Sequence, residues 1–264
     1  MTLAQAAVLF DLDGTLIDPA GGITGGIAAA LQEAGLPIPS DQALQAMVGP
    51  RLSHALQEFA GVPEQRVDEV IALYRRHYRT TGMAASRVYP GIRETLAELR
   101  ARGYALAVAT QKPRTLALEL LGLHGLVESF DTVQGSSDDE SAQGPGHGVP
   151  LGKQQIIAAA LEELGAPASA VMVGDRYQDV EGATANGLPC IGVAWGFAVE
   201  GELERAGAAS VVSSTEELLR GLPGPAGAHS GEPPLAGREA AATVAVFGGA
   251  VVDGAAEEED HGRI

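Results

Sequence analysis

Short runs of apolar residues, each followed by a polar residue, recur along the chain and mark where strands are expected. Residues 6–10 read Ala-Ala-Val-Leu-Phe, residues 106–109 read Leu-Ala-Val-Ala, and residues 171–173 read Val-Met-Val. Unbroken apolar runs of this length are typical of strands buried on both faces. Segments with apolar residues at helical spacing separate these runs. The pattern therefore predicts an α/β fold with helices covering both faces of a parallel sheet.

The elements of this Rossmann-like sheet are expected within residues 1–18 and 87–221. Strands are predicted at residues 6–10, 104–110, 131–134, 170–174, 191–193 and 209–212, and helices at residues 92–102, 113–121, 153–164 and about 176–186. Because strand and helix alternate, each connection crosses over and successive strands run parallel. Sheets of this kind bind their ligands beyond the carboxyl ends of the strands.

Residues 19–86 carry no strand pattern and interrupt the alternation after the first strand. Apolar residues recur at helical spacing in four segments, at residues 23–36, 41–48, 51–60 and 63–80. We therefore expect an inserted all-helical cap domain at residues 19–86. Two stretches predict little structure: residues 136–152 read as a long loop, and residues 222–264, rich in Pro and Gly and then in acids, read as a mostly disordered acidic tail.

Two carboxylates follow the first predicted strand directly. Asp11 and Asp13 lie two positions apart, and side chains at i and i+2 of an extended chain point the same way. Gly14 allows a sharp turn immediately after them. Converging carboxylates repel one another unless a cation or a shared proton joins them, and Mg²⁺ prefers oxygen ligands and works on phosphate groups. The Asp-Leu-Asp-Gly-Thr sequence at residues 11–15 therefore predicts a magnesium site at the end of this strand.

Other candidate site residues lie at strand ends or begin a helix. Asp175 follows a buried strand, and Asp179 comes four positions later, about one helical turn along. Thr110 ends another apolar strand. Lys153 begins a helix, where positive charge is ordinarily disfavoured by the helix dipole. Because the carboxyl ends of parallel strands meet at one edge of the sheet, we expect these side chains to share one site.

In this order, the motifs resemble those of the haloacid dehalogenase superfamily of aspartate-dependent phosphohydrolases. The motifs are Asp-Leu-Asp-Gly-Thr, the strand that ends in Thr110, then Lys153, and the Gly-Asp-x-x-x-Asp sequence at residues 174–179. The resemblance covers roughly residues 7–220. Within the superfamily the chain is similar to the phosphoglycolate-phosphatase-like group with a helical cap, on the strength of Val-Tyr-Pro-Gly-Ile at residues 88–92, Gly-Asp-Arg at residues 174–176 and Ala-Asn-Gly-Leu at residues 185–188.

The resemblance implies a phosphatase that works through an aspartyl-phosphate. It implies that Asp11 is the nucleophile, and that Asp13 is the general acid for the leaving alkoxide and then the general base for water. Lys153 would pair with the phosphoryl group and with Asp11. Lys112 is the alternative lysine, and the family's placement of this residue before the Gly-Asp strand favours Lys153.

The remaining site residues would hold the metal and the substrate. The resemblance implies that Asp11, the backbone carbonyl of Asp13 and Asp175 bind Mg²⁺, while Asp179 either holds a metal-bound water or orients Lys153. Expected substrate-binding residues are Gly14, Thr15, Thr110, Gln111 and Arg51. The last of these lies in a turn between two predicted cap helices, where related caps present a substrate loop. It could pair bidentately with a carboxylate or a second phosphate, or be solvated.

Composition narrows the possible partners and location. A formal net charge of −17 argues against nucleic-acid binding and against binding to anionic membranes. No apolar run reaches the roughly 20 residues that span a bilayer, and residues 1–10 do not read as a signal peptide. Cys190 is the only cysteine, which fits a reduced, cytoplasmic setting. The expected partner is a small phosphorylated metabolite, and the protein is expected to be a monomer or a homodimer.

The activity expected from these features is that of a magnesium-dependent phosphoric monoester hydrolase, with phosphoglycolate suggested by the resemblance. A 5′-nucleotidase or a sugar phosphomutase would use the same core. A dehalogenase or a phosphonatase is disfavoured, because neither needs the acid that Asp13 supplies. A non-catalytic binding protein on this scaffold would be expected to lack Asp11, Asp13, Lys153 or Asp175, and all four are present.

Overall fold

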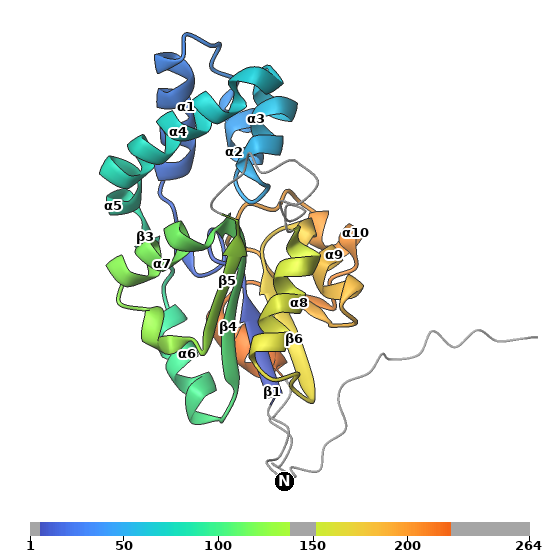
Figure 1. Cartoon of the computed structure of the whole chain (residues 1–264). Helices are drawn as coiled ribbons and strands as arrows, with labels where there is room; N and C mark the ends of the chain where they lie inside the picture. Colours follow the sequence, from blue (N-terminus) through green and yellow to red (C-terminus); the bar gives the residue numbers. More distant parts are fainter. Residues whose placement is uncertain (1–5, 138–151, 223–264) are drawn as a thin grey trace, which may run out of the picture. The chain divides into compact units, whose positions relative to one another are not determined.

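A computed structural model describes residues 6–137 and 152–222, and six of the described strands form one parallel sheet (Figure 1). Their order is β5-β4-β1-β6-β7-β8, which places the first strand at the centre. The strands are β1 (Ala6–Phe10), β4 (Ala105–Pro113), β5 (Thr132–Ser136), β6 (Ser169–Gly174), β7 (Cys190–Val193) and β8 (Ser210–Val212). The sheet and its flanking helices confirm the predicted fold class.

Alternate residues of the central strand pack into two separate clusters of buried apolar residues. Val8 and Phe10 belong to one cluster of buried apolar residues, and Ala7 and Leu9 belong to a second cluster. All five residues of β1 are buried, because it pairs with β4 on one side and with β6 on the other. Burial on both faces explains why this strand reads as an unbroken apolar run.

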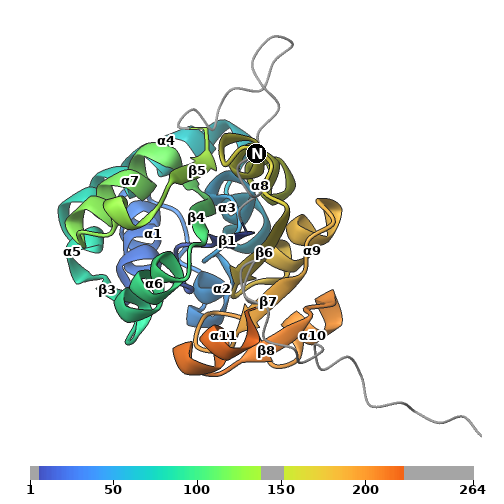
Figure 2. The same ribbon diagram turned by 90° about the horizontal axis from the view of Figure 1, so that it is seen from below.

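Helices cover both faces of the sheet. Figure 2 shows α6 (Ile92–Ala101) and α7 (Arg114–Leu123) on one side, with α8 (Lys153–Glu163) and α9 (Tyr177–Ala185) on the other. The first pair contributes Leu96 and Leu120 to the cluster that contains Phe10. The second pair contributes Ile157 and Val180 to the cluster that contains Leu9. Each helix thus buries its apolar stripe against one face of the sheet.

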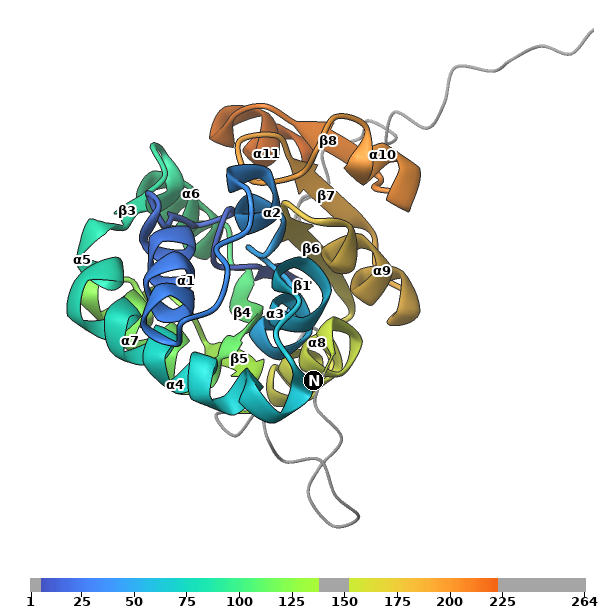
Figure 3. The ribbon, with the colours of Figure 1, turned by 90° about the horizontal axis from the view of Figure 1, so that it is seen from above.

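The chain between β2 (Ile17–Asp18) and β3 (Arg87–Val88) is helical in the structure. Figures 1 and 3 show these inserted helices beyond the carboxyl ends of the strands. They are α1 (Gly22–Glu33), α2 (Asp41–Ala46), α3 (Leu52–Ala60), the 3₁₀ turn Glu64–Arg66, α4 (Val67–His77), the π-helical turn Tyr78–Gly82 and α5 (Met83–Ala85). Local chemistry sets two of the boundaries. The Ser40 hydroxyl accepts a hydrogen bond from the Ala43 amide at the start of α2, and Gly61 ends α3 with φ at 62°.

Some short elements were not anticipated from the sequence. The strands β2 and β3 pair antiparallel, Ile17 with Val88 and Asp18 with Arg87. The helices α10 (Glu202–Ala206) and α11 (Thr215–Gly221) flank β8. A strand of two residues and a helix of about one turn are too short to show a periodic pattern.

Three expectations from the sequence stay predictions. The described residues all fall in one compact unit, so the division into core and cap stays a prediction. Most of the predicted loop at residues 136–152, and the tail from residue 223, lie outside the described residues. In the part of the chain that is described, no helix is long and apolar enough to cross a membrane.

Candidate active site

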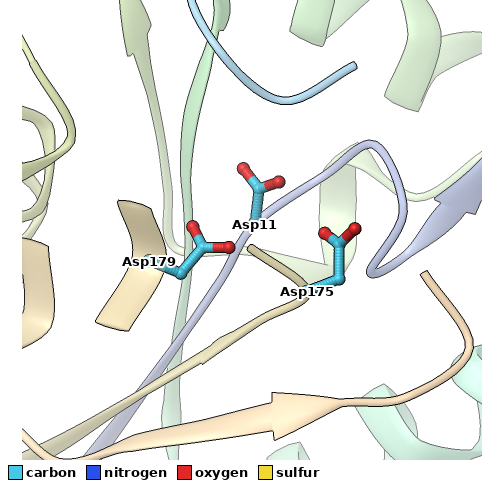
Figure 4. A group of neighbouring side chains, drawn as sticks. All are labelled: Asp11, Asp175 and Asp179. Carbon is cyan, nitrogen blue, oxygen red and sulfur yellow. The ribbon is translucent and has the colours of Figure 1, made fainter. Parts of the chain in front are cut away.

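Three aspartates converge at the carboxyl edge of the sheet (Figure 4). Asp11 directly follows β1, Asp175 directly follows β6, and Asp179 lies in the first turn of α9. Each offers a carboxylate oxygen, and these oxygens all lie within 4.8 Å of one another. All three side chains are buried. Neighbouring parallel strands therefore bring Asp11 next to two carboxylates that are more than 160 positions away in the sequence.

Missing side chains make room for this cluster. Gly14 has φ at +88°, and a Cβ on it would lie 2.3 Å from Asp175 Oδ2. A Cβ on Gly174 would lie 2.2 Å from the Asp179 carboxyl carbon. No side chain could be accommodated at either distance. Both glycines are therefore required by the close approach of the carboxylates, and at Gly14 the backbone conformation requires glycine as well.

Lys153 lies among the carboxylates and neutralises part of their charge. Its Nζ atom is 2.6 Å from Asp11 Oδ1 and 2.6 Å from Asp179 Oδ1. Burial alone would lower the pKa of Lys153, but the two carboxylates outweigh burial and raise the pKa above its usual value. The lysine therefore stays protonated, and one charged group contacts two of the three aspartates.

Asp175 is held by two hydrogen bonds. The Thr15 hydroxyl donates to its Oδ1 at 3.0 Å, and the Phe197 amide donates to its Oδ2 at 2.8 Å. Burial, and then the charges of Asp11 and Asp179, raise the pKa of Asp175 well above its usual range. Hydrogen bonds thus hold the Asp175 carboxylate in place, but its negative charge is unfavourable there without a cation. Trp195 joins this network, because its indole N–H donates to the Thr15 carbonyl at 3.1 Å.

Asp13 pairs with Lys112, which sequence analysis considered only as an alternative to Lys153. Lys112 Nζ donates to Asp13 Oδ2 at 2.7 Å and lies 4.3 Å from the centre of the Tyr78 ring. The pairing of β4 with β5 is irregular between Ala109 and Pro113, and Lys112 lies in that irregular segment. Burial raises the pKa of Asp13, and Lys112 opposes that shift. The other carboxylate oxygen of Asp13 is buried without a hydrogen-bond partner.

A hollow of about 60 Å³ lies against these carboxylates. Its lining includes Asp11, Asp13, Thr110, Gln111 and Lys112 from the sheet edge, and Ile23, Met47, Gly49, Pro50, Leu52, Tyr74 and Arg75 from the inserted helices and their turns. Thr110 Oγ1 accepts a hydrogen bond from the Lys112 amide at 3.2 Å. Gln111 Oε1 is buried without a hydrogen-bond partner.

Arg51 is placed differently from the other predicted substrate-binding residues. It immediately precedes α3 and is half-buried. Pro50 and Leu52 on either side line the hollow, but Arg51 is not among the described lining residues. Its Nε atom is buried without a hydrogen-bond partner. The structure therefore brings every predicted site residue to this end of the sheet, with Arg51 at the margin.

The donor set fits a hard divalent cation. Three buried carboxylates with one lysine leave an excess of negative charge, and the described cluster contains oxygen donors only. Mg²⁺ uses few protein carboxylates and keeps several waters, whereas zinc sites are typically built from His and Cys. The residues that could hold such an ion are Asp11 and Asp175, with Asp179 beside them.

Arg176 is a further residue that sequence reasoning missed as part of this region. Its side chain leaves the loop between β6 and α9 and contacts the turn between α2 and α3. The sequence signals were its position directly after Asp175 and its place in the Gly-Asp-Arg sequence at residues 174–176, and neither gave it a role. Nothing in the pattern shows which distant carbonyl an arginine will reach.

Comparison with protein families gives a match over most of the described chain. Residues 8–193 match the model of the haloacid dehalogenase-like hydrolases. The chain is 38% identical over 197 residues to a 5′-nucleotidase of Pseudomonas aeruginosa, covering 74% of this chain and 86% of the relative. It is 35% identical over 222 residues to a phosphoglycolate phosphatase of Cupriavidus necator, covering 83% and 93%.

Two further matches are a solved phosphatase structure and a protein named a kinase. A solved structure of a predicted phosphatase from Clostridium acetobutylicum is 37% identical, with a TM-score of 0.74, and the match covers 83% of this chain and 98% of the other. The chain is also 38% identical over 191 residues to the tyrosine-protein kinase PtkA of Mycobacterium tuberculosis, covering 72% of this chain and 62% of the relative. Similar sequences thus carry the names of both phosphatases and a kinase.

Proposed function

Because this chain belongs to the haloacid dehalogenase-like hydrolase family and is a phosphoric monoester hydrolase, we propose that its substrate is a small phosphate monoester. The proposed reaction passes through an aspartyl-phosphate on Asp11 and uses Mg²⁺ as cofactor. The observation that carries the proposal is the contact of Asp11 with Lys153 inside a cluster of three buried aspartates. A carboxylate in this setting can attack phosphorus, because the adjacent positive charge would offset the negative charge of the phosphate group.

The proposed reaction has two steps with balanced proton transfers. In the first, an oxygen of Asp11 bonds to phosphorus, the bond from phosphorus to the leaving oxygen breaks, and Asp13 gives that oxygen a proton. In the second, water attacks the same phosphorus, Asp13 takes back a proton, and the bond to Asp11 breaks. Asp13 suits this role because its Oδ1 has no hydrogen-bond partner and its residue lines the hollow.

Neutralisation of charge is divided between the protein and the ion. Mg²⁺ bound by Asp11, Asp175 and the Asp13 carbonyl would polarise the phosphoryl oxygens and offset their charge. Lys153 is already in contact with Asp11 and would reach the same phosphoryl group. Asp179 contacts Lys153 at 2.6 Å, which favours its proposed role in orienting that lysine. Thr110 and the Gln111 amide would bind a further phosphoryl oxygen.

The size of the hollow favours a small leaving group. About 60 Å³ is far below the roughly 300 Å³ or more typical of pockets for larger ligands. We therefore propose a glycolate-sized leaving group, such as that of 2-phosphoglycolate. A 5′-nucleotide is the second candidate, supported by the relative named a 5′-nucleotidase, and it would require the inserted helices to move away. A panel of 2-phosphoglycolate, 5′-nucleotides and sugar phosphates, compared by kcat/KM, tests the choice. Preference for a nucleotide would overturn it.

The acid–base role of Asp13 predicts a difference between leaving groups. Asp13→Asn should slow the single-turnover phosphorylation step by roughly 10²–10⁴-fold for an alkyl phosphate, because the alkoxide then leaves without a proton. For p-nitrophenyl phosphate the loss in that step should be much smaller, since its leaving group needs little protonation. Rapid-quench measurement of both substrates gives the comparison. Equal losses would assign Asp13 a structural or metal-organising role.

The raised pKa values predict how pH and Mg²⁺ act on stability. Burial raises the pKa of Asp179 from its usual value of 3.8 to about 6, so between these two pH values the metal-free folded protein binds more protons than the unfolded chain. Its contribution to stability is present under acidic conditions and lost as pH rises through about 6. Mg²⁺ needs ionised carboxylates, so the increase in Tm on adding Mg²⁺ should be larger at pH 7 than at pH 5. Each kcal/mol that Mg²⁺ binding adds to the free energy of unfolding should raise Tm by roughly 2–4 °C. Thermal melts at both pH values, each with and without Mg²⁺, check this; an increase that shrinks with rising pH would contradict it.

A further inference from the structure

Arg176 lies between the aspartate cluster and the inserted helices, and the proposed reaction gives it no part. It directly follows Asp175, and its backbone amide donates to Asp179 Oδ2 at 3.0 Å. The residue is buried, with 8% of its surface exposed. Its backbone is therefore tied to the active site while its side chain points elsewhere.

One end of the side chain is fixed by an ion pair within the core. Arg176 Nε donates to Glu202 Oε1 at 2.9 Å. Glu202 also accepts hydrogen bonds from the Tyr177 amide at 3.0 Å and the Val199 amide at 3.1 Å. Although burial raises the pKa of Glu202, these donors outweigh it and lower the pKa below its usual value. Glu202 is thus a fixed anion that holds the guanidinium in one orientation.

The other end of the side chain reaches the turn between α2 and α3. Arg176 Nη1 donates to the carbonyl of Val48. Gly49 follows with φ at +107°, and a Cβ on it would lie 3.1 Å from Arg176 Cγ and 3.3 Å from Nη1. The turn therefore rests directly on the arginine side chain, and the absence of a side chain at Gly49 is what permits the contact.

The same turn lines the active-site hollow. Met47, Gly49 and Pro50 face the hollow that Asp11 and Asp13 also line. One part of the turn therefore contacts Arg176 while another part bounds the space next to the reacting carboxylates. A shift of the turn relative to Arg176 would therefore change the shape of the hollow.

We propose that Arg176 is a positioning residue that fastens the Val48–Gly49 turn over the active site and so sets how tightly the non-reacting part of the substrate is held. The inference rests on the proposed function only in taking the hollow as the substrate site. Arginine suits the task because its planar fork can donate in two fixed directions at once, whereas lysine presents one compact charge. Hydrogen bonds from a charged donor are also stronger than neutral ones.

Arg176→Gln tests the proposal, with Arg102→Gln as its matched control. Arg102 makes the same pair of contacts away from the site, from Nε to Glu98 at 2.8 Å and from Nη1 to the Leu219 carbonyl at 3.1 Å. We expect Arg176→Gln to lower kcat/KM for 2-phosphoglycolate by about 10- to 100-fold, mainly through KM, and Arg102→Gln to change it by less than about threefold. Arg176→Lys should keep the pairing with Glu202 and still show the raised KM.

A second variant acts on the contact from the opposite side. Gly49→Ala places a methyl group 3.1 Å from Arg176 Cγ and, with φ at +107°, also strains the turn itself, so it should raise KM through both effects. The double variant Arg176→Gln/Gly49→Ala should lose less activity than the sum of the two single losses, because the part of each loss that comes from this contact is removed only once. Arg176→Lys, which keeps the positive charge beside Glu202, decides the proposal if Arg176→Gln does not fold. Fully additive losses would overturn the proposal.

Amide hydrogen exchange supplies a measurement that is independent of activity. Peptides covering residues 45–56 should exchange faster in Arg176→Gln than in wild type, and Arg102→Gln should not change them. Mg²⁺ affinity, read from Trp195 fluorescence, should stay within about twofold of wild type. The proposal is overturned if exchange and KM match those of Arg102→Gln, or if Mg²⁺ affinity and kcat fall together with unchanged exchange. If the wild-type protein is inactive on every ester, the proposed function is rejected. Amide hydrogen exchange would still show whether Arg176 fastens the Val48–Gly49 turn.

Discussion

Asp11→Asn should abolish turnover and leave the fold intact. The amide cannot form the acyl-phosphate, and removal of a covalent nucleophile costs on the order of 10⁴-fold or more in kcat. The substitution keeps the shape of the side chain and lets its oxygen still accept from Lys153, which donates to Asp11 Oδ1 at 2.6 Å in the wild type. Steady-state kcat, together with acid-quench detection of phosphorylated protein, gives the measurement. No phosphoprotein should accumulate in the variant.

A matched substitution separates this effect from a general loss of charge. Asp68 is exposed in the first turn of α4, and Asp68→Asn removes the same charge away from the site. It should retain wild-type kcat. An Asp11→Asn protein with kcat near that of Asp68→Asn would show that Asp11 is not the nucleophile.

Removal of divalent metal should have an effect of similar size. Without Mg²⁺, the anionic ester meets the aspartates with two lysines beside them, Lys153 at Asp11 and Lys112 at Asp13. Loss of a metal that offsets transition-state charge is worth several kcal/mol, so chelation should lower kcat by about 10³-fold or more. Excess Mg²⁺ should restore it. Undiminished turnover after exhaustive chelation would exclude a metal-dependent mechanism.

The only tryptophan of the chain provides a direct readout of metal binding. Trp195 donates to the Thr15 carbonyl, and the Thr15 hydroxyl donates to Asp175. Binding at Asp175 should therefore change Trp195 fluorescence in a saturable way, and Asp175→Asn should remove the change. A fluorescence response that survives Asp175→Asn would place the ion elsewhere.

Much of the central sheet could be predicted because each strand carries its own local signal. Residues 6–10 are apolar throughout and are buried on both faces, so the pattern and the environment agree. Asp11 and Asp175 were found because each directly follows such a strand, and parallel strands end at the same edge. Lys153 was found at the start of α8, where the charge departs from ordinary helix preference.

Lys112 and Arg176 could not be assigned in this way because their partners are distant. Lys112 reaches Asp13, which is 99 positions away, from an irregular part of β4 that no periodic pattern marks. Arg176 reaches the Val48 carbonyl, which is 128 positions away, and a backbone acceptor carries no sequence signature. Arg51 fell at the margin of the hollow because its orientation depends on the turn before α3, which the helix pattern does not set.

The pairing of β2 with β3 has a consequence for how this protein could diverge from its relatives. Because Ile17 pairs with Val88 in a separate two-stranded sheet, the helical insertion begins and ends at neighbouring points. Everything between these points is one contiguous stretch of sequence, and a longer excursion costs little closure entropy, about 0.6 kcal/mol for each doubling of length. One genetic exchange within that stretch would replace the part of the hollow's wall that the inserted helices supply and leave the carboxylates at the strand ends untouched. Under the proposed function, an exchange of this kind would change the substrate range and keep the hydrolytic chemistry.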